Sequence, residues 1–170
     1  NQKMSTYLVS SEIIQFNQAT TTDAFKVSHK TFDVITEAQR IAAHTDGAFD
    51  ITLRPLISAW GFGSGQEERP PEPEDIALLT ANIGYQNLQL NKTDHTIEKS
   101  IPELELDVSA IAKGYAVDQV AEMLHSIGMR NYMVEVGGET RAFGINPKDK
   151  VWQIGIERPD ASRGVLIEII

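Results

Sequence analysis

The residues best suited to chemistry lie between Leu104 and Asp118, where a carboxylate, a hydroxyl and an amine follow one another closely. A short alternating stretch ends at Asp107, Ser109 follows it, and Lys113 falls in the first turn of an expected helix. The first amides of a helix lack partners, and the helix dipole draws anions to the same end. The pattern therefore predicts a ligand that carries phosphate, with Asp107 placed for a metal ion or for a sugar or base donor.

A structural interpretation of this segment stays open, because strand–turn–helix units with a serine at the helix start are common. Ser109 is better explained as a helix cap than as a nucleophile, since no Gly-x-Ser-x-Gly elbow surrounds it. Lys113 could be a solvated lysine, although a cation at a helix N-terminus is unfavourable without a ligand to offset it. The four histidines do not have the spacing of metal ligands, and His125 suits the negative end of a helix.

Residues 45–63 form a second segment whose side chains suit a ligand. Asp46-Gly47 is a strong turn signal, and Ala48, Phe49 and Asp50 follow directly at the lip of that turn. The segment ends in Trp60-Gly-Phe-Gly63, where the glycines let a backbone or a ligand approach two aromatic rings closely.

Residues 132–142 form a third segment, whose sequence is typical of one strand before Gly137-Gly138 and a second strand after it. The glycine pair is a weak signal for a phosphate loop, and a β-bulge explains it better. Arg141 is expected to pair with Glu135 or Glu139 on these strands.

Taken in order along the chain, these segments resemble the ApbE family of FAD:protein FMN transferases. The resemblance extends from end to end and rests on the stretches Met4–Tyr7 with Ser11, Glu12 and Asn17, then Thr45–Thr52, Pro55-Leu56, Trp60–Gly63, Glu105–Asp118 and Tyr132–Ala142.

The resemblance implies a flavin site assembled from several of these segments. It carries FAD contacts over to Tyr7, Ala48, Phe49, Asp50, Asp107 and Lys113, with Tyr7 as a stacking or packing surface for a flat ring. It also implies a metal position at Ala110, where the backbone carbonyl is the one donor because the side chain has none. An oxygen ligand of this kind suits Mg²⁺. The resemblance assigns no catalytic residue to this chain.

The reaction implied by the resemblance is the transfer of FMN from FAD to a threonine hydroxyl of a target redox protein, with Mg²⁺ as cofactor and AMP as the leaving group. Two alternatives use the same FAD-binding segments. One is a pyrophosphatase that hydrolyses FAD to FMN and AMP, and the other is a non-catalytic protein that binds FAD.

Part of the family pattern is not matched. The family's Asp and Thr metal ligands and its His-x-x-Asp-Pro segment lie in a C-terminal third that finds no counterpart here. We therefore expect residues 1–170 to be an incomplete ApbE-like domain that is inactive alone. The resemblance further implies a bacterial periplasmic location, with a lipid anchor outside this chain as a route to the inner membrane.

Composition narrows the class of protein. The net charge of −9 opposes binding to nucleic acid, whose phosphates would be repelled, and it means that anionic FAD needs local cations. Hydrophobic residues make up 41% and charged residues 23% of the chain, as in ordinary globular proteins. The chain has no cysteine, so disulfides and thiolate metal sites are excluded from it, and it has no apolar run long enough to span a bilayer.

The periodicity of apolar residues predicts an α+β fold with mixed helices and a largely antiparallel sheet, and the family resemblance adds a relation to the T-fold. A first helix is expected from Ser10 or Ser11 to Phe16, and a second after Ser28 with its buried face formed by Phe32, Ile35, Ala38 and Ala42. A third is expected over Glu74–Asn82. A fourth is expected over Ala110–Ile127, with Gly128 as its C-cap and an inward face formed by Val117, Val120, Ala121 and Leu124. Strands are expected over Tyr85–Leu90, His95–Glu98, Glu103–Asp107, Asn131–Val136, Thr140–Phe143, Val151–Glu157 and Val165–Ile170, with a turn at Asn91–Asp94 and a polar loop at Gly63–Pro73.

Overall fold

A computed structural model describes residues 2–62, 70–160 and 164–170 of the chain. The chain forms two compact units, Asn1–Ala112 and Lys113–Ile170. Gly63 of the aromatic segment and most of the expected Gly63–Pro73 loop lie outside the described residues.

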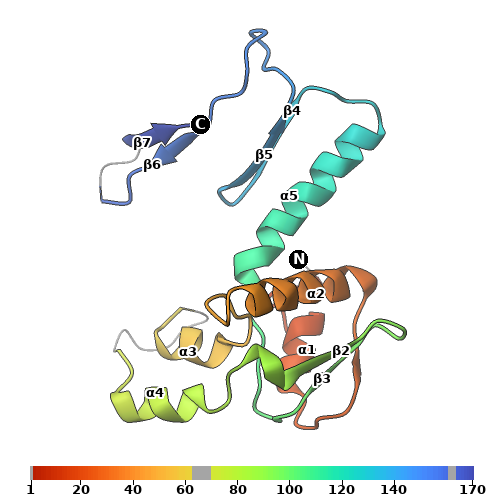
Figure 1. The fold of residues 1–170 in the computed structure, drawn as a ribbon, viewed down its shortest axis with the longest axis vertical. Helices are drawn as coiled ribbons and strands as arrows, with labels where there is room; N and C mark the ends of the chain where they lie inside the picture. Colours follow the sequence, from red (N-terminus) through yellow and green to blue (C-terminus); the bar gives the residue numbers. More distant parts are fainter. Residues whose placement is uncertain (1, 63–69, 161–163) are drawn as a thin grey trace. The chain divides into compact units, whose positions relative to one another are not determined.

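The first unit combines short helices with a small antiparallel sheet (Figure 1). Its helices are α1 (Glu12–Gln18), α2 (His29–His44), α3 (Arg54–Ala59), α4 (Pro73–Thr80) and the 3₁₀ turn η1 (Tyr85–Asn87). Its sheet has the strand order β1-β3-β2, with bounds β1 (Phe25–Lys26), β2 (Leu88–Asn91) and β3 (Thr96–Lys99).

Helices α1 and α2 begin where the sequence predicts. Ser11 caps α1, because its hydroxyl oxygen accepts a hydrogen bond from the Ile14 amide at 3.1 Å. Ser28 precedes α2 in extended conformation, but its hydroxyl donates to the Glu12 carboxylate at 2.9 Å instead of capping the helix. The apolar stripe predicted for α2 is buried as expected: Phe32, Ile35, Ala38 and Ala42.

The core of the first unit is formed by α1, α2, the sheet and one extended segment that crosses between them. Phe16 of α1 packs edge-on against Phe25 of β1, with ring centroids 5.7 Å apart. Ile97 of β3 is fully buried, and so are the segment's Leu104, Leu106 and Val108. This packing fixes the path of the chain on both sides of Asp107.

The strand predicted over Glu103–Asp107 is wrong, although its alternation of buried and exposed side chains is right. The segment is extended but belongs to neither of the strand pairs of this unit. Its backbone is satisfied by side chains instead: Asn17 donates to the Leu106 carbonyl at 2.9 Å and accepts from the Leu106 amide at 2.8 Å. The buried ammonium of Lys99 donates to the Leu104 carbonyl at 3.2 Å.

Two further differences concern helical turns. The strand predicted from Tyr85 begins only at Leu88, because Asn87 donates to the Gly84 carbonyl and Tyr85 donates to Asp50, which winds the chain into η1. Helix α3 was not predicted. Pro55 in its first turn was the available signal, since proline is favoured there.

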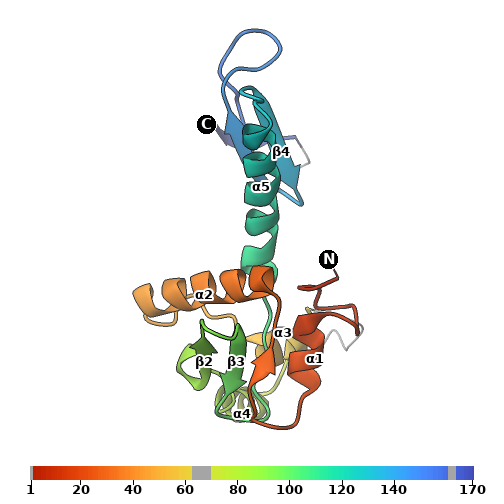
Figure 2. The same ribbon diagram turned by 90° about the vertical axis from the view of Figure 1, so that its right-hand side faces the viewer.

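The second unit consists of α5 (Ser109–Ser126), whose first residues belong to the first unit, and two antiparallel hairpins (Figure 1). Figure 2 shows α5 with β4 beside it. The hairpins pair β4 (Tyr132–Val136) with β5 (Glu139–Phe143) and β6 (Gly155–Glu157) with β7 (Leu166–Ile169). Val117 and Ala121 of α5 pack against Tyr132 and Val134 of β4, with Leu124 beside them. Gly128, at a φ of +88°, ends the helix as predicted.

Several details of the second unit correct the sequence analysis. Val120 is 39% exposed and does not face inward. Gly137-Gly138 is a two-residue hairpin turn with φ positive at both residues, not a bulge, because Val136 pairs directly with Glu139. Arg141 pairs with Asp118 of α5 at 2.8 Å rather than with a glutamate on its own hairpin. The strands predicted over Val151–Glu157 and Val165–Ile170 are shorter than expected.

The predicted α+β class is confirmed, and each strand pair of the described sheets is antiparallel. Within the part of the chain that the structure describes, no helix combines the length and apolar character needed to cross a membrane.

The first prediction concerns pH and the contact between α1 and α2. Burial raises the pKa of Glu12, but hydrogen bonds from Thr31 and Ser28 outweigh it and hold that pKa below its ordinary value. A carboxyl with a lowered folded pKa stabilises the fold above its ordinary pKa, and this stability is lost as pH falls through the folded pKa. Glu12→Gln should therefore lower the free energy of unfolding by about 1 kcal/mol at neutral pH.

The difference in free energy of unfolding between wild type and Glu12→Gln should shrink toward zero as pH falls below about 4. Urea unfolding at several pH values measures this difference. Glu74→Gln, on the exposed first turn of α4, controls for the loss of one negative charge. A difference that stays constant with pH would contradict this role of the Glu12 carboxylate.

Candidate functional site

A cavity of about 530 Å³ in the first unit gathers residues from four separate segments of the chain. Its volume lies in the range usual for small-molecule sites, about 300–1,000 Å³. The cavity is lined by Tyr7, Ala48, Phe49, Asp50, Ile51, Leu53, Ile57, Gly61, Phe62, Asp107, Ser109 and Ala110. The structure thus brings together six of the seven residues to which the sequence analysis assigns FAD or metal contacts.

The turn at Asp46-Gly47 places Ala48, Phe49 and Asp50 in the wall of the cavity. The turn lies where the sequence predicts it, and φ is positive at both residues, at 51° for Asp46 and 80° for Gly47. The Gly47 amide donates back to the Ala42 carbonyl at 2.9 Å, and the Phe49 amide donates to the Thr45 hydroxyl at 3.2 Å. These bonds reverse the chain directly after α2.

The carboxylate of Asp50 is occupied by groups of the protein itself. One oxygen accepts from the Thr52 amide at 2.8 Å and from the Thr52 hydroxyl at 2.7 Å. The other accepts from the Tyr85 amide at 2.8 Å, and the Thr52 hydroxyl accepts in turn from the Gly84 amide. Asp50 therefore ties the cavity wall to the start of η1, a structural role in addition to any contact with a ligand.

Tyr7 lies on a tightly wound loop before α1. Ser5 accepts hydrogen bonds from the Tyr7 and Leu8 amides, both at 3.1 Å, and Ser11 donates to the Ser5 carbonyl at 2.6 Å. The Tyr7 side chain is nevertheless 70% exposed, so a fixed backbone presents an open aromatic face at the cavity. An aromatic side chain of this kind can stack against a flat ring.

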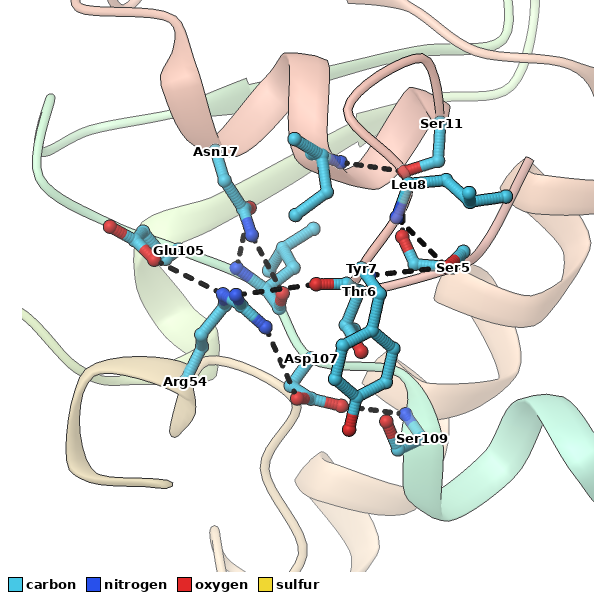
Figure 3. Close-up of polar contacts among 12 residues, drawn as sticks. Ser5, Thr6, Tyr7, Leu8, Ser11, Asn17, Arg54, Glu105, Asp107 and Ser109 are labelled. Carbon is cyan, nitrogen blue, oxygen red and sulfur yellow. Dashed lines mark hydrogen bonds and ion pairs between the residues drawn. The ribbon is translucent and has the colours of Figure 1, made fainter. Parts of the chain in front are cut away.

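Asp107 is nearly buried, with a side chain that is 8% exposed, and Arg54 lies beside it (Figure 3). One carboxylate oxygen accepts from the Ser109 amide at 2.8 Å, and the other lies 3.5 Å from the Arg54 guanidinium. Arg54 also lies 3.3 Å from the Glu105 carboxylate and donates to the Thr6 carbonyl at 3.4 Å. Asp107 is thus held in place before any ligand arrives.

The start of α5 differs from the expectation for Ser109. Ser109 is the first helical residue, and the side chain that caps its amide is that of Asp107. The first turn that follows brings Ala110 to the cavity.

The described residues fit the implied Mg²⁺ only in part. No group of three or more carboxylate, histidine or cysteine side chains among them could hold a metal ion. The oxygens of Asp50 and Asp107 already accept hydrogen bonds or face Arg54. The Ala110 carbonyl is a suitable hard donor, and a magnesium ion there would need further oxygen ligands from other sources.

Lys113 belongs to the second unit, and its ion pair and hydrogen bond are made within that unit. Its ammonium lies 2.9 Å from the Glu139 carboxylate and donates to the Gly137 carbonyl at 3.2 Å. The Glu139 pKa is lowered by this hydrogen bond. The contact between Lys113 and FAD stays a prediction.

Arg54 and Thr52 organise the site, although neither was predicted from the sequence to do so. Thr52 ends the family-matching stretch Thr45–Thr52, and Arg54 lies between that stretch and Pro55-Leu56. An arginine flanked by apolar residues, with a following proline typical of a helix start, was the signal that could have identified Arg54.

The comparisons with known proteins bear on the whole chain. The model of the ApbE family matches residues 1–170. Proteins named FAD:protein FMN transferase from Vibrio cholerae and Haemophilus influenzae are 44% and 42% identical to this chain over its full length. The chain covers 51% and 50% of those two proteins, so it spans about half the length of these relatives.

Solved structures of similar proteins have the same fold. The flavin transferase ApbE from Vibrio cholerae has a TM-score of 0.88 at 44% identity, over 94% of this chain and 51% of that one. The apbe protein from Thermotoga maritima has a TM-score of 0.87 at 29% identity, over 99% of this chain and 54% of that one. The family resemblance drawn from the sequence is confirmed.

The second prediction tests the structural role of Asp50. Asp50→Ala removes the acceptor of three hydrogen bonds and should lower the free energy of unfolding by about 2–3 kcal/mol. Urea unfolding followed by far-ultraviolet circular dichroism measures this change, with the exposed Asp23→Ala as control. Unchanged stability together with lost FAD binding would show that Asp50 serves the ligand alone.

Proposed function

Because the chain belongs to the ApbE family, we propose that its protein transfers FMN from FAD to a threonine hydroxyl of another protein, with Mg²⁺ as cofactor and AMP as the second product. The proposal concerns the whole protein, since the chain spans about half the length of its relatives.

The cavity of the first unit is the observation that best supports the proposal. Tyr7, Phe49 and Asp107 come from distant parts of the sequence and line one space of suitable volume, as a flavin site requires. The exposed faces of Tyr7 and Phe62 at this cavity suit an isoalloxazine or adenine ring.

The proposed step is a displacement at phosphorus. The threonine oxygen attacks the phosphorus of the FMN half of FAD, and the bond from that phosphorus to the bridging oxygen breaks. AMP leaves with the bridging oxygen, and the hydroxyl proton passes to a base or to solvent. Such transfers depend mainly on positioning and on stabilising the charge of the phosphates.

Bound Mg²⁺ would neutralise part of the pyrophosphate charge and polarise the phosphorus. Among the described residues, the Ala110 carbonyl is the proposed protein ligand. The proposed partner is a redox protein that carries the acceptor threonine, and the proposed location is the bacterial periplasm, with a lipid anchor outside this chain as the attachment to the inner membrane.

The third prediction is the reaction itself. The full-length protein, incubated with FAD, Mg²⁺ and a threonine-bearing acceptor peptide, should yield a peptide that carries FMN and an equal amount of AMP. Mass spectrometry and chromatography measure the two products. EDTA should abolish both, and added Mg²⁺ should restore both, because the metal offsets the phosphate charge.

A matched peptide with valine in place of threonine is the control and should stay unmodified. Free FMN and AMP without labelled peptide would identify a pyrophosphatase, with water as the acceptor. Intact FAD that stays bound would identify a binding protein, and either result would overturn the proposed transfer.

The fourth prediction tests the contact between Lys113 and FAD. Lys113→Ala should weaken FAD binding about tenfold, since a hydrogen bond from a cation to a phosphate or flavin oxygen is lost. Quenching of flavin fluorescence measures the dissociation constant.

Glu139→Gln provides the matched control, because it breaks the same ion pair but keeps the ammonium. FAD should bind to this variant at least as tightly as to wild type. Equal weakening in both variants would mean that the ion pair matters for structure and that Lys113 does not contact FAD.

A further inference from the structure

We propose that Arg54 is a positioning residue of the flavin site: its guanidinium fixes Asp107 and the Tyr7 loop against each other and thereby sets the shape of the cavity that receives FAD. This inference rests on the proposed function, because it assigns a role in binding the same ligand.

Arg54 is an unusual arginine for its degree of burial. Its side chain is 17% exposed, although arginine is rarely buried unless it is paired. The guanidinium meets two carboxylates and one carbonyl, on Glu105, Asp107 and Thr6. Figure 3 shows the guanidinium lying among these three groups. A planar guanidinium with donors on several sides can bind the two carboxylates and the carbonyl at the same time, whereas the ammonium of a lysine is a single point charge.

The first consequence concerns Asp107. A carboxylate that is 8% exposed is costly to bury unless a cation or several donors compensate for it. Arg54 supplies that compensation on one oxygen, while the Ser109 amide is bound to the other. Arg54 therefore holds the side chain that caps α5, and through it the first turn that brings Ala110 to the cavity.

The second consequence concerns Tyr7. Thr6 is buried, and its carbonyl is the point at which Arg54 contacts the loop that carries Tyr7. The loop's serine hydrogen bonds wind its own backbone but do not connect it to the Asp107 segment. Arg54 links these two sides of the cavity, although it does not line the cavity itself.

The test compares Arg54→Met, Arg54→Lys and wild type in the full-length protein. Arg54→Met keeps much of the length of the side chain and removes the charge and the donors. It should weaken FAD binding and raise the KM for FAD about tenfold, with kcat changed less than about threefold. The reason is that the variant loses the preformed shape of the binding site but keeps every group that takes part in the reaction. Arg54→Lys should recover part of the affinity, since it restores the charge but not the planar fork.

Arg40→Met is the matched control. Arg40 lies in the same unit and pairs with Glu37, but its side chain is 56% exposed and lies on the outer face of α2. This variant should bind FAD like wild type. Binding is measured by flavin fluorescence at a temperature at which circular dichroism shows each variant to be folded, so a change in stability alone does not alter the result.

A double-mutant cycle with Asp107→Asn tests whether Arg54 acts through Asp107. If it does, Arg54→Met should weaken binding less than about threefold in the Asp107→Asn background, because coupled residues give non-additive effects. Unchanged FAD affinity in folded Arg54→Met, or fully additive losses in the double variant, would overturn the proposal. Wild-type protein that fails to bind FAD would instead overturn the proposed function, which keeps the two failures distinct.

Discussion

The first unit depends on how one extended segment, Leu104–Val108, is held in its core without a strand partner. Buried backbone groups must find hydrogen bonds, and here side chains provide them. Asn17 binds both polar groups of Leu106, as a neighbouring strand would, and Lys99 binds the Leu104 carbonyl. The Asp107 amide donates to the Ile51 carbonyl at 2.7 Å, which joins the segment to the cavity wall. The position of Asp107, and with it the start of α5, follows from these bonds.

Local signals explain which parts of the fold the sequence predicts. The Ser11 cap, the apolar stripe of α2 and the Gly128 helix end depend on neighbouring residues, and all three are confirmed. The Glu103–Asp107 strand is wrong because alternation reports only which side chains are buried. It does not reveal that the partner of Leu106 is an asparagine far away in the sequence. The pairing of Arg141 with Asp118 is likewise a contact between separate elements, which spacing along one hairpin cannot reveal.

The candidate site was predictable through motifs but not through its supporting contacts. Ala48, Phe49, Asp50 and Asp107 stand in segments with recognisable turns and family resemblance, and they line one cavity. Arg54 lies outside the matched stretches and Thr52 at the end of one, and their supporting roles depend on partners on three other segments. The sequence thus identifies the residues that line the cavity more readily than those that hold them in place.

The electrostatics of the cavity follow from these supporting contacts. FAD, the proposed ligand, carries a negative pyrophosphate, and two carboxylates line the cavity proposed to bind it, in a chain with a net charge of −9. Each carboxylate is already compensated: Asp50 by three hydrogen bonds, and Asp107 by one amide and the Arg54 guanidinium. Compensation within the protein reduces the repulsion that an anionic ligand meets, because the field of a paired charge falls off faster than that of a free one.

The same compensation leaves neither carboxylate as an open metal ligand, so a divalent cation at the cavity would depend on carbonyl, water and phosphate oxygens. The same side chains can therefore hold the fold and still allow a phosphate ligand to approach.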